Sequence, residues 1–401
     1  MLRALLILTL LAAPAAASAQ RRLSAPNWVR SAEVTRPGTT VRARPTTASP
    51  RRGTVRVGTR MPFLGRVMGE GCPGGEWIQV GARAFVCETL VRFSPSPPAG
   101  DEVPLVPEGS LTPRHYAFVR TDGTWAYSRP DDYFMDRWTE SLGRGFGVAI
   151  VDRRTLDGVE LSRTLNGLWI PSAELRFAQP SAFLGTELDE GRAVDSVAWV
   201  VRPNATLRAR PNGRVEGRAS RLQPLTIVET SGDWLRTSDE TWIRARDVAR
   251  PRPATPPPEV GDGARWIDVD TRTQTLVAYV GSRPVYATAV STGRANHATP
   301  TGTFRIWVKL AEDDMDDLER EDVSENYAIQ AVPWVQYFND SIALHAAFWH
   351  DRFGMPRSHG CVNLSPQDAR WLFSFTQPNL PVGWDAVLPS EEARGTVVRV
   401  R

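Results

Sequence analysis

The residues best suited to chemistry are the run 358–363, Ser-His-Gly-Cys-Val-Asn, in which a thiol follows a histidine by two positions. A second histidine, His345, ends a short apolar stretch thirteen residues before Ser358. Cysteine is a nucleophile only as its thiolate, so it needs a nearby base or cation. Gly360 keeps side-chain bulk away from the backbone N–H groups beside the thiol, which can then face the oxyanion formed by attack on a carbonyl. We therefore interpret Cys361 as a catalytic nucleophile.

The N-terminal residues 1–19 have the pattern of a secretory signal peptide. Arg3 provides the positive charge, residues 5–11 form a short apolar core, and residues 17–19 (Ala-Ser-Ala) form a small-residue cleavage site. The apolar core is too short to span a bilayer, and no other segment reads as a membrane span. We expect export to the periplasm or cell envelope, with no stable membrane insertion after cleavage.

Export determines how the three cysteines are interpreted. Cys72 and Cys87 flank Trp77 in one segment, and in an oxidising compartment they are expected to form a local disulfide. Cys361 is then the unpaired thiol. A buried apolar cysteine is the usual alternative for such a residue, but its position after His359 and Gly360 favours a reactive one.

Composition limits the possible partners and the number of domains. The 401 residues leave room for two to four domains. A net charge of only +3 gives no reason to expect a nucleic-acid partner. The basic residues are almost all arginine, and Lys309 is the only lysine.

A recurring pattern precedes the reactive run. Copies open with Val-Arg-Ala-Arg-Pro at 41–45, Ala-Tyr-Ser-Arg-Pro at 126–130 and Leu-Arg-Ala-Arg-Pro at 207–211. Inside each copy, short β-rich runs alternate with turn residues, which predicts small β modules at 32–95, 112–178 and 197–250. These modules resemble bacterial SH3-like (SH3b) domains, with an unusual insert in the second at 133–139. The resemblance implies wall or partner binding, although a spacer role is equally compatible with the pattern.

The last domain is predicted at 264–389. Residues 251–263 form a Pro-rich linker, expected to hold this domain away from the preceding modules. Strands are predicted at 266–270, 275–280, 285–290 and 303–308, and a helix at 366–375 with Ser365 as its N-cap. The predicted fold class is therefore mostly β: tandem small SH3-like β-barrels, then a β-rich catalytic domain with few helices.

An acidic run separates two of the predicted strands. Residues 312–325 contain nine acidic side chains and one arginine. The spacing does not fit an EF-hand, so we expect a solvated loop, and its position makes it a candidate lid over the active site.

The domain from 264 onward resembles an L,D-transpeptidase catalytic domain of the YkuD type. The matching elements are Ile-Asp-Val at 267–269, Ser-Thr-Gly at 291–293, Thr-Pro-Thr-Gly-Thr-Phe at 299–304, Ile-Ala-Leu-His at 342–345 and the 358–363 run. The resemblance implies an enzyme that acts on peptidoglycan stem peptides. Cys361 would attack the carbonyl on the L-centre of meso-diaminopimelate in a tetrapeptide stem, releasing D-Ala. An amine on a second stem, or on a protein, would resolve the thioester, giving a 3→3 cross-link or wall attachment.

The resemblance also implies roles for individual residues. His345 is the base, oriented by the backbone carbonyl of Ala346, while His359 remains a competing base from the sequence alone. Ser358 is expected to form local hydrogen bonds. Asn363 stands where many relatives carry arginine, and it either contacts the acyl donor or fixes the loop.

Two other classes of function remain open. Water as acceptor would make the protein an L,D-carboxypeptidase or amidase, and an inactive domain would make it a wall-binding scaffold. A zinc site from the three histidines near Cys361 is not favoured, because no spacing fits a zinc motif and a metal would occupy the thiolate. We therefore expect no metal and no cofactor.

Overall fold

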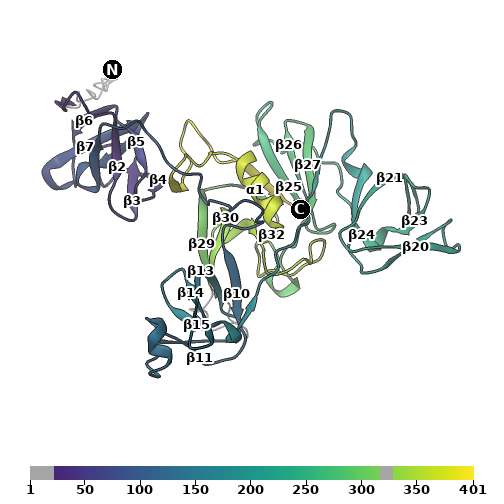
Figure 1. Cartoon of the computed structure of the whole chain (residues 1–401). Coiled ribbons are helices and arrows are strands. Elements are labelled where there is room, and N and C mark those ends of the chain that lie inside the picture. Colours follow the sequence, from purple (N-terminus) through teal and green to yellow (C-terminus); the bar gives the residue numbers. More distant parts are fainter. Residues whose placement is uncertain (1–21, 317–327) are drawn as a thin grey trace, which may run out of the picture. The chain divides into compact units, whose positions relative to one another are not determined.

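The computed structural model describes residues 22–316 and 328–401, so the predicted signal peptide lies outside the described residues. The fold is mostly β, as expected, with a single α-helix among the described residues. The chain divides into two compact units (Figure 1). The first ends at Ala99 and excludes residues 52–56, which belong with residues 100–401 in the second unit.

The first unit consists of short antiparallel strands. One sheet contains β1, β6, β7, β8 and β3, and a second contains β5, β2 and β9. Their bounds are β1 Arg22–Leu23, β2 Ser31–Val34, β3 Thr39–Arg42, β5 Arg60–Pro62, β6 Gly65–Met68, β7 Glu76–Gly81, β8 Ala84–Cys87 and β9 Val91–Ser94. The strand β4 (Arg51–Val55) lies at the boundary between the units, and residues 53–55 pair with β33 of the second unit.

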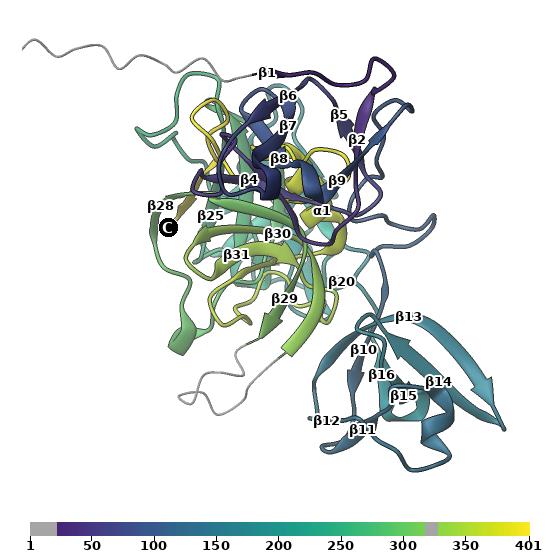
Figure 2. The same ribbon diagram turned by 90° about the vertical axis from the view of Figure 1, so that its left-hand side faces the viewer.

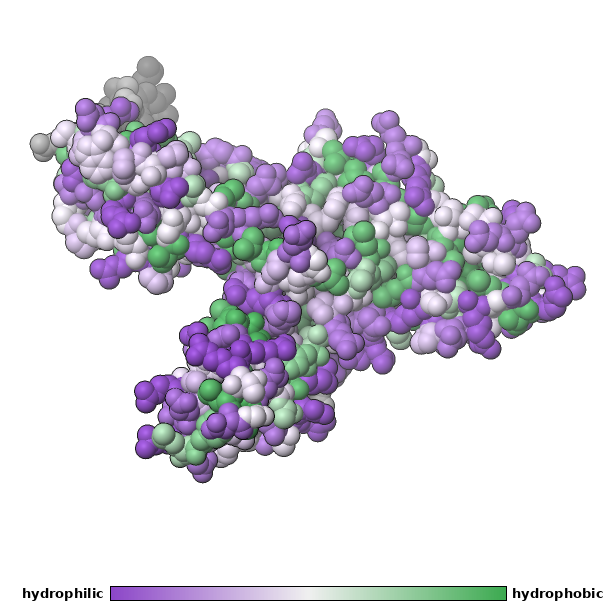
Figure 3. Space-filling model, viewed as in Figure 1, coloured by the Kyte–Doolittle hydropathy of each residue, from purple (hydrophilic) through white to green (hydrophobic). Residues whose placement is uncertain are grey.

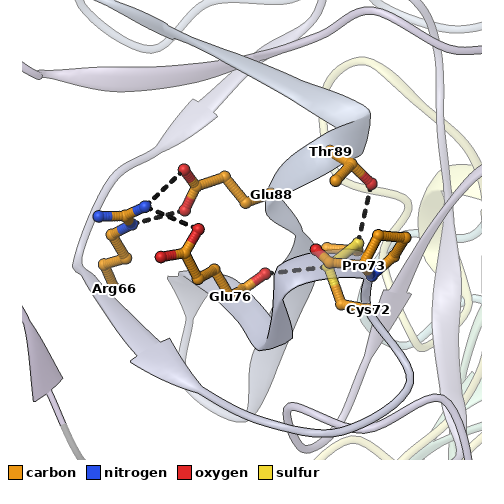
Figure 4. The surroundings of a disulfide bond; sticks show 7 residues. Arg66, Cys72, Pro73, Glu76, Glu88 and Thr89 are labelled. Carbon is orange, nitrogen blue, oxygen red and sulfur yellow. Dashed lines mark hydrogen bonds and ion pairs between the residues drawn. A yellow bond between two sulfur atoms is a disulfide. The ribbon is translucent and has the colours of Figure 1, made fainter.

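A disulfide closes the β6–β8 region. Cys72 and Cys87 are joined, with an S–S distance of 2.00 Å, and both pack against the buried ring of Trp77. Beside them, Arg66 donates to Glu88 at 2.6 Å and pairs with Glu76 at 2.9 Å (Figure 4). The covalent loop and this ion pair fix the same end of the sheet.

Within the second unit, the strands between His115 and Phe177 form a group that we call the 112–178 module (Figure 2). Its strands are β10 His115–Val119, β11 Thr124–Ala126, β12 Glu140–Leu142, β13 Gly147–Leu156, β14 Val159–Thr164, β15 Trp169–Pro171 and β16 Leu175–Phe177. β10 pairs antiparallel with β13 and β16, while β11 and β12 form a separate ribbon. Alternate apolar residues of these strands, such as Ala117, Val148 and Ile170, form the core of this module.

A second module follows at residues 197–250. Its strands run in the order β20-β19-β23-β22-β21-β18-β24. Their bounds are β18 Val197–Val200, β19 Ala205–Arg208, β20 Val215–Ala219, β21 Pro224–Ser231, β22 Trp234–Thr237, β23 Trp242–Arg244 and β24 Val248–Ala249. Leu225, Leu235 and Ile243 belong to its buried core.

The C-terminal domain is a sandwich of two sheets. One sheet has the order β17-β27-β26-β25-β34-β28, and the other includes β33, β29, β30, β31 and β32. The bounds are β17 Thr186–Glu187, β25 Arg265–Asp270, β26 Thr275–Val280, β27 Arg283–Ala289, β28 Gly302–Arg305, β29 Val308–Asp316, β30 Ala328–Asn339, β31 Ile342–Ala346, β32 Val362–Leu364, α1 Pro366–Phe375, β33 Trp384–Val387 and β34 Val397–Val400. Helix α1 begins after Ser365, whose side chain accepts a hydrogen bond from the Asp368 N–H, as expected for an N-cap.

Side-chain alternation assigns each face of the sandwich to a different core. Ile267 and Val269 of β25 point into the central core with Leu344 of β31, Val362 of β32 and Leu372 of α1. The inner faces of both sheets, together with α1, thus bury one apolar layer.

The outer faces of the sandwich are covered by the two modules of the second unit. Trp266 and Tyr279 share an apolar cluster with Trp199 from the 197–250 module. On the opposite side, Tyr116 of β10 stacks on Phe348 at a centroid distance of 3.7 Å. Strands that are buried on both faces explain the continuous apolar runs in this domain.

Three expectations from the sequence are wrong. The linker at 251–263 does not hold the domain away from the preceding module: Pro251 is buried, and Arg252 pairs with the carboxylate of Asp270 at 2.6 Å. The domain does not end at 389, because β34 pairs with both β25 and β28. The predicted strand 303–308 is two elements, β28 and the start of β29, separated by residues 306–307.

The acidic run is also partly mispredicted. Residues 312–316 belong to β29 and not to a solvated loop. Glu312 pairs with Arg114 at 2.7 Å, and Asp313 accepts a hydrogen bond from the Tyr337 hydroxyl at 2.8 Å. Residues 317–325, on which the lid hypothesis depends, lie outside the described residues.

The single lysine has a structural role at the end of α1. Lys309 of β29 is fully buried, and its Nζ donates to the carbonyl oxygens of Phe373 at 2.6 Å and Thr376 at 2.9 Å. The same ammonium lies 4.3 Å from the centre of the Phe373 ring. Because the last carbonyls of a helix have no partner within the helix, Lys309 satisfies two groups that burial would otherwise leave unpaired.

We expect the Lys309→Met variant to be destabilised by about 2 kcal/mol, because it leaves two buried carbonyls without a donor. Burial also lowers the pKa of Lys309 to about 7, below the usual value of 10.5 for the unfolded chain. Between pH 7 and pH 10.5 the unfolded state therefore binds more protons than the folded state. The contribution of Lys309 to the free energy of unfolding thus increases as the pH rises. Denaturant titrations from pH 7 to pH 10 should therefore show the difference between the parent protein and the variant widening. Arg272→Met, on an exposed turn, serves as control, and equal stability of Lys309→Met and the parent would contradict this role.

Replacing both Cys72 and Cys87 by alanine should lower the free energy of unfolding of the first unit by roughly 3 kcal/mol, the chain-entropy estimate for a loop of this length. Limited proteolysis would then cut residues 60–90 before the second unit. Preferential cleavage in the second unit would contradict this assignment.

Candidate active site

The site is organised by parallel pairing of β31 with β32. In this register Leu344 lies opposite Val362, and His345 lies opposite Asn363. Leu344 and Val362 face the central core, so the alternation turns His345 and Asn363 to the other face. Cys361 immediately precedes β32 and belongs to this second face: its sulfur accepts from the Ala343 N–H at 3.4 Å. The pairing thus brings both predicted catalytic side chains to one surface.

His345 is held in a single orientation. Its Nδ1 lies 3.0 Å from the backbone oxygen of Ala346. A carbonyl can only accept, so Nδ1 carries the hydrogen and Nε2 retains its lone pair. The ring also lies against Trp349, at a centroid distance of 5.7 Å. His345 therefore has the tautomer that a general base requires.

His359 occupies a different environment. The Nη2 of Arg294 lies 2.5 Å from the Nε2 of His359, and a guanidinium can only donate. The Nε2 lone pair of His359 is therefore engaged. The ring of His297 lies edge-on to that of His359, at 4.8 Å. This arrangement disfavours His359 as the base.

The turn before Cys361 is fixed by two hydroxyl groups. The Ser358 hydroxyl donates to the backbone oxygen of Cys361 at 2.5 Å and accepts from the Gly360 N–H at 3.2 Å. The Thr299 hydroxyl donates to the Gly360 oxygen at 2.7 Å. Gly360 has a φ of +124°, which side chains rarely adopt. Its N–H is already bonded, so Gly360 shapes the turn and does not itself offer a donor to an oxyanion.

The thiol is half-buried and borders an apolar cluster that includes Val332, Ala343 and Phe348. Burial raises the pKa of Cys361 to about 11, an effect that the Ala343 N–H partly opposes. Burial likewise lowers the pKa of His345 to about 4, an effect that its bond to Ala346 partly opposes. At neutral pH the resting pair is therefore a neutral thiol and a neutral imidazole, not an ion pair.

Asn363 forms part of a smaller polar contact on the same face. Its Nδ2 lies 3.1 Å from the Nε2 of His350, whose Nδ1 accepts from the Arg352 N–H at 3.1 Å. Burial, with the charge of Arg357, lowers the pKa of His350 to about 3. His350 is thus a neutral ring whose Nδ1 accepts and whose Nε2 carries the hydrogen, so it can bond only to the oxygen end of the Asn363 amide.

The side chains predicted from the sequence lie close together, and two further residues contact them. His345, Ala346, Ser358, His359, Gly360, Cys361 and Asn363 all belong to the β31–β32 region or the turn before it. Arg294 and His350 were not assigned roles. Arg294 follows the Ser-Thr-Gly element directly, and that motif was the only available signal. For His350 there was none, because its contact with Asn363 depends on the fold.

Comparisons with known proteins assign this region to a family. Residues 264–400 match the model of the YkuD L,D-transpeptidase catalytic domain. YciB of Bacillus subtilis (strain 168), named as a candidate L,D-transpeptidase, is 28% identical over 137 residues. That match covers 29% of this chain and 63% of the relative, so the chain spans less than two thirds of YciB.

Solved structures give weaker likenesses. The L,D-transpeptidase from Stackebrandtia nassauensis is 25% identical, with 36% of this chain and 58% of that chain covered and a TM-score of 0.25. Mycobacterium tuberculosis L,D-transpeptidase 1 is 20% identical, with 34% and 61% covered and a TM-score of 0.26. Scores this low add nothing to the assignment, which depends on the family model.

The C-terminal part of the chain is therefore an enzyme domain. Specifically, residues 264–400 are a YkuD-type L,D-transpeptidase catalytic domain.

Iodoacetamide should alkylate Cys361 slowly at pH 7, because a pKa of about 11 leaves roughly one thiolate in ten thousand molecules. The rate should rise about tenfold per pH unit between pH 7 and pH 9, as followed by mass spectrometry of the resting protein. The His345→Gln variant should show the same slope, since a neutral pair gains nothing from the imidazole. A rate independent of pH above 6 in the parent protein would instead indicate a thiolate–imidazolium pair.

Proposed function

We propose that this protein is an exported cysteine L,D-transpeptidase that acts on peptidoglycan tetrapeptide stems and forms 3→3 cross-links or attaches protein to the wall. The observation that carries the proposal is the shared face of His345 and Cys361, with the His345 tautomer fixed by Ala346. The family match supplies the substrate class.

The reaction has two halves. In the first, Cys361 Sγ bonds to the stem carbonyl while its proton passes to His345 Nε2. The tetrahedral intermediate then releases D-Ala, whose amine takes that proton, and a thioester remains. In the second, an acceptor amine attacks the thioester and loses its proton to His345, and the thiol is regenerated. The neutral resting pair suits this sequence, because the proton moves only when the carbonyl is in place.

Neighbouring residues position these groups. Ser358 and Thr299 hold the turn at Gly360, and so fix the direction of the Cys361 side chain. Arg294, through His359, places a positive charge beside the turn, where an anionic stem carboxylate would be attracted. Asn363, in contact with His350, would hydrogen-bond the acyl donor.

The remaining parts of the proposal concern location and targeting. The pattern of residues 1–19 and the Cys72–Cys87 disulfide support export to the periplasm or cell envelope. Within the described residues, no helix is long and apolar enough to cross a membrane. We propose that the small β modules, which resemble SH3-like domains, bring the enzyme to the wall.

The test is incubation of the mature protein with tetrapeptide muropeptides, followed by mass spectrometry. Dimers with 3→3 links are expected. Tripeptides without dimers would show that water is the acceptor and that the enzyme is an L,D-carboxypeptidase. Absence of both products would overturn the enzymatic proposal.

Substitutions can show whether His345 or His359 acts as the base. Cys361→Ala should abolish turnover, and His345→Gln should lower the rate of thioester formation by 10² to 10⁴. His359→Gln is the matched control and should retain a larger fraction of the rate, because its Nε2 is already bonded to Arg294. A greater loss in His359→Gln than in His345→Gln would reverse the assignment of the base.

A further inference from the structure

One arginine of the 197–250 module holds the segment that connects β31 to β32. Arg221 donates to the backbone oxygen of Asp351 from Nε at 3.3 Å and from Nη2 at 3.1 Å. The same Nη2 donates to the backbone oxygen of Phe353 at 2.8 Å, and Nη1 donates to the backbone oxygen of Val201 within the module. A single guanidinium thus bridges the module and two carbonyl groups of the segment 351–353, a geometry that suits its planar set of donors.

The segment and the module are also packed together. Phe353 is fully buried in a cluster that includes Trp199 and Ala249 of the module. At Gly354, where φ is +86°, an added Cβ would lie 2.3 Å from the Cγ1 of Val201. Both the backbone conformation and the space therefore require glycine, which lets the segment approach the module closely.

The turn that carries Arg221 is itself constrained. The next residue, Leu222, has a φ of +61°, which a leucine rarely adopts. Its N–H donates to the Val200 oxygen at 2.7 Å, and its side chain packs against the cluster that contains Phe353. A strained conformation of this kind persists only where its surroundings enforce it. Burial lowers the pKa of Arg221, and the carbonyl oxygens replace the water that the guanidinium loses.

The two carbonyl groups bonded by Arg221 flank Arg352, whose main chain sets the ring of His350. The Arg352 N–H donates to His350 Nδ1 at 3.1 Å, and the Arg352 oxygen accepts from the Ser291 hydroxyl at 2.8 Å. The hydrogen of the neutral His350 ring is therefore on Nε2, which lies 3.1 Å from the side-chain amide of Asn363. A donor at this position requires the amide oxygen to face His350, so the amide N–H groups point to the opposite side.

The opposite end of the Asn363 amide is available to a ligand. Asn363 is only 3% exposed and lies on the same face of the strand pair as His345. The amide atom turned away from His350 is buried and has no hydrogen-bond partner within residues 22–316 and 328–401. A buried polar group of this kind is costly unless something else bonds to it. The tautomer of His350 thus decides whether this position offers N–H donors or a lone pair.

We propose that Arg221 is a positioning residue of the active site: it fixes the peptide groups of 351–353, which set the tautomer of His350 and, through it, the direction of the Asn363 amide. The 197–250 module is then a part of the catalytic apparatus and not only a means of targeting. The effect on catalysis rests on the proposed function. The effect on His350 does not, so the two can be tested separately.

The first experiment follows the tautomer in the full mature chain labelled with ¹⁵N-histidine. The chain has five histidines, and a His350→Gln spectrum identifies the signals of His350. In the parent protein the ring nitrogen shifts should show one tautomer, protonated at Nε2. In Arg221→Met they should move toward the average of the two tautomers. Arg221→Lys keeps the charge but not the planar fork, so it should show a smaller shift and replaces Arg221→Met if that variant does not fold.

Arg218→Met is the matched control from the same module. Arg218 belongs to β20, around which the surface is mostly hydrophilic (Figure 3), and its Nη1 donates to the Asn204 oxygen at 3.2 Å. Its replacement should leave the signals of His350 unchanged. A single Nε2-protonated tautomer that persists in the folded Arg221 variant, or an equal shift in Arg218→Met, would overturn the proposal.

The second experiment measures thioester formation from a tetrapeptide stem. Arg221→Met should slow this step about tenfold, and Arg218→Met should not change it. Asn363→Ala should slow it at least as much, and adding Arg221→Met to Asn363→Ala should cost nothing further, because both changes act through one amide. An unchanged rate in Arg221→Met, or losses that multiply in the double variant, would contradict a positioning role. If the parent forms no thioester, the proposed function fails, while the spectra still decide whether Arg221 sets His350.

Discussion

Two parallel strands, β31 and β32, determine what this molecule can do. Parallel strands cannot be joined by a tight turn, so the chain between them, residues 347–361, must leave the sheet and return. This connecting segment contains His350 and the 358–361 turn. Its C-terminal end enters β32 so that Cys361 and His345 lie on the same face of the strand pair. The opposite face, with Leu344 and Val362, is buried in the central core against α1. A slip of either strand by one residue would turn that strand's site residue, His345 on β31 or Asn363 on β32, into that core, so apolar packing enforces the register.

The apolar residues around Cys361 and His345 keep both side chains neutral in the resting protein. Phe348 and Val332 lie in the cluster that the thiol borders, and Tyr116 of the adjacent module covers the same cluster. Low polarity disfavours both thiolate and imidazolium, which explains why the pKa of Cys361 is raised and the pKa of His345 is lowered from the same cause. A positive charge lies near the start of the 358–361 turn, where the Arg294 guanidinium bonds to His359. The module at 112–178 thus contributes to the electrostatics of a site to which it gives no catalytic residue.

The sequence allowed much of this to be predicted, but it did not reveal how the parts pack. The 358–363 run and the position of His345 predicted the residues of the site, and Ser365 with Pro366 predicted the start of α1, because these signals are local. The contact of His345 with the Ala346 carbonyl was expected from the family resemblance, whereas the tautomer of His359 depends on Arg294, a contact that exists only after folding. The proline-rich stretch at 251–263 looked like a free spacer, yet Arg252 is tied to Asp270 and the 197–250 module shares a core with Trp266. Strand β34 was missed because a four-residue apolar run carries little periodic signal.

The placement of Lys309 has a consequence for the proposed transfer of acyl groups to amines. The only ε-amino group in the chain is sealed beneath the end of α1, bonded to Phe373 and Thr376. Every other basic side chain except histidine is a guanidinium, which does not resolve a thioester under ordinary conditions. Apart from its α-amino group, the protein offers no nucleophile of the kind it is proposed to use. Under the proposed function, no lysine side chain of this sequence is therefore exposed as an acyl acceptor.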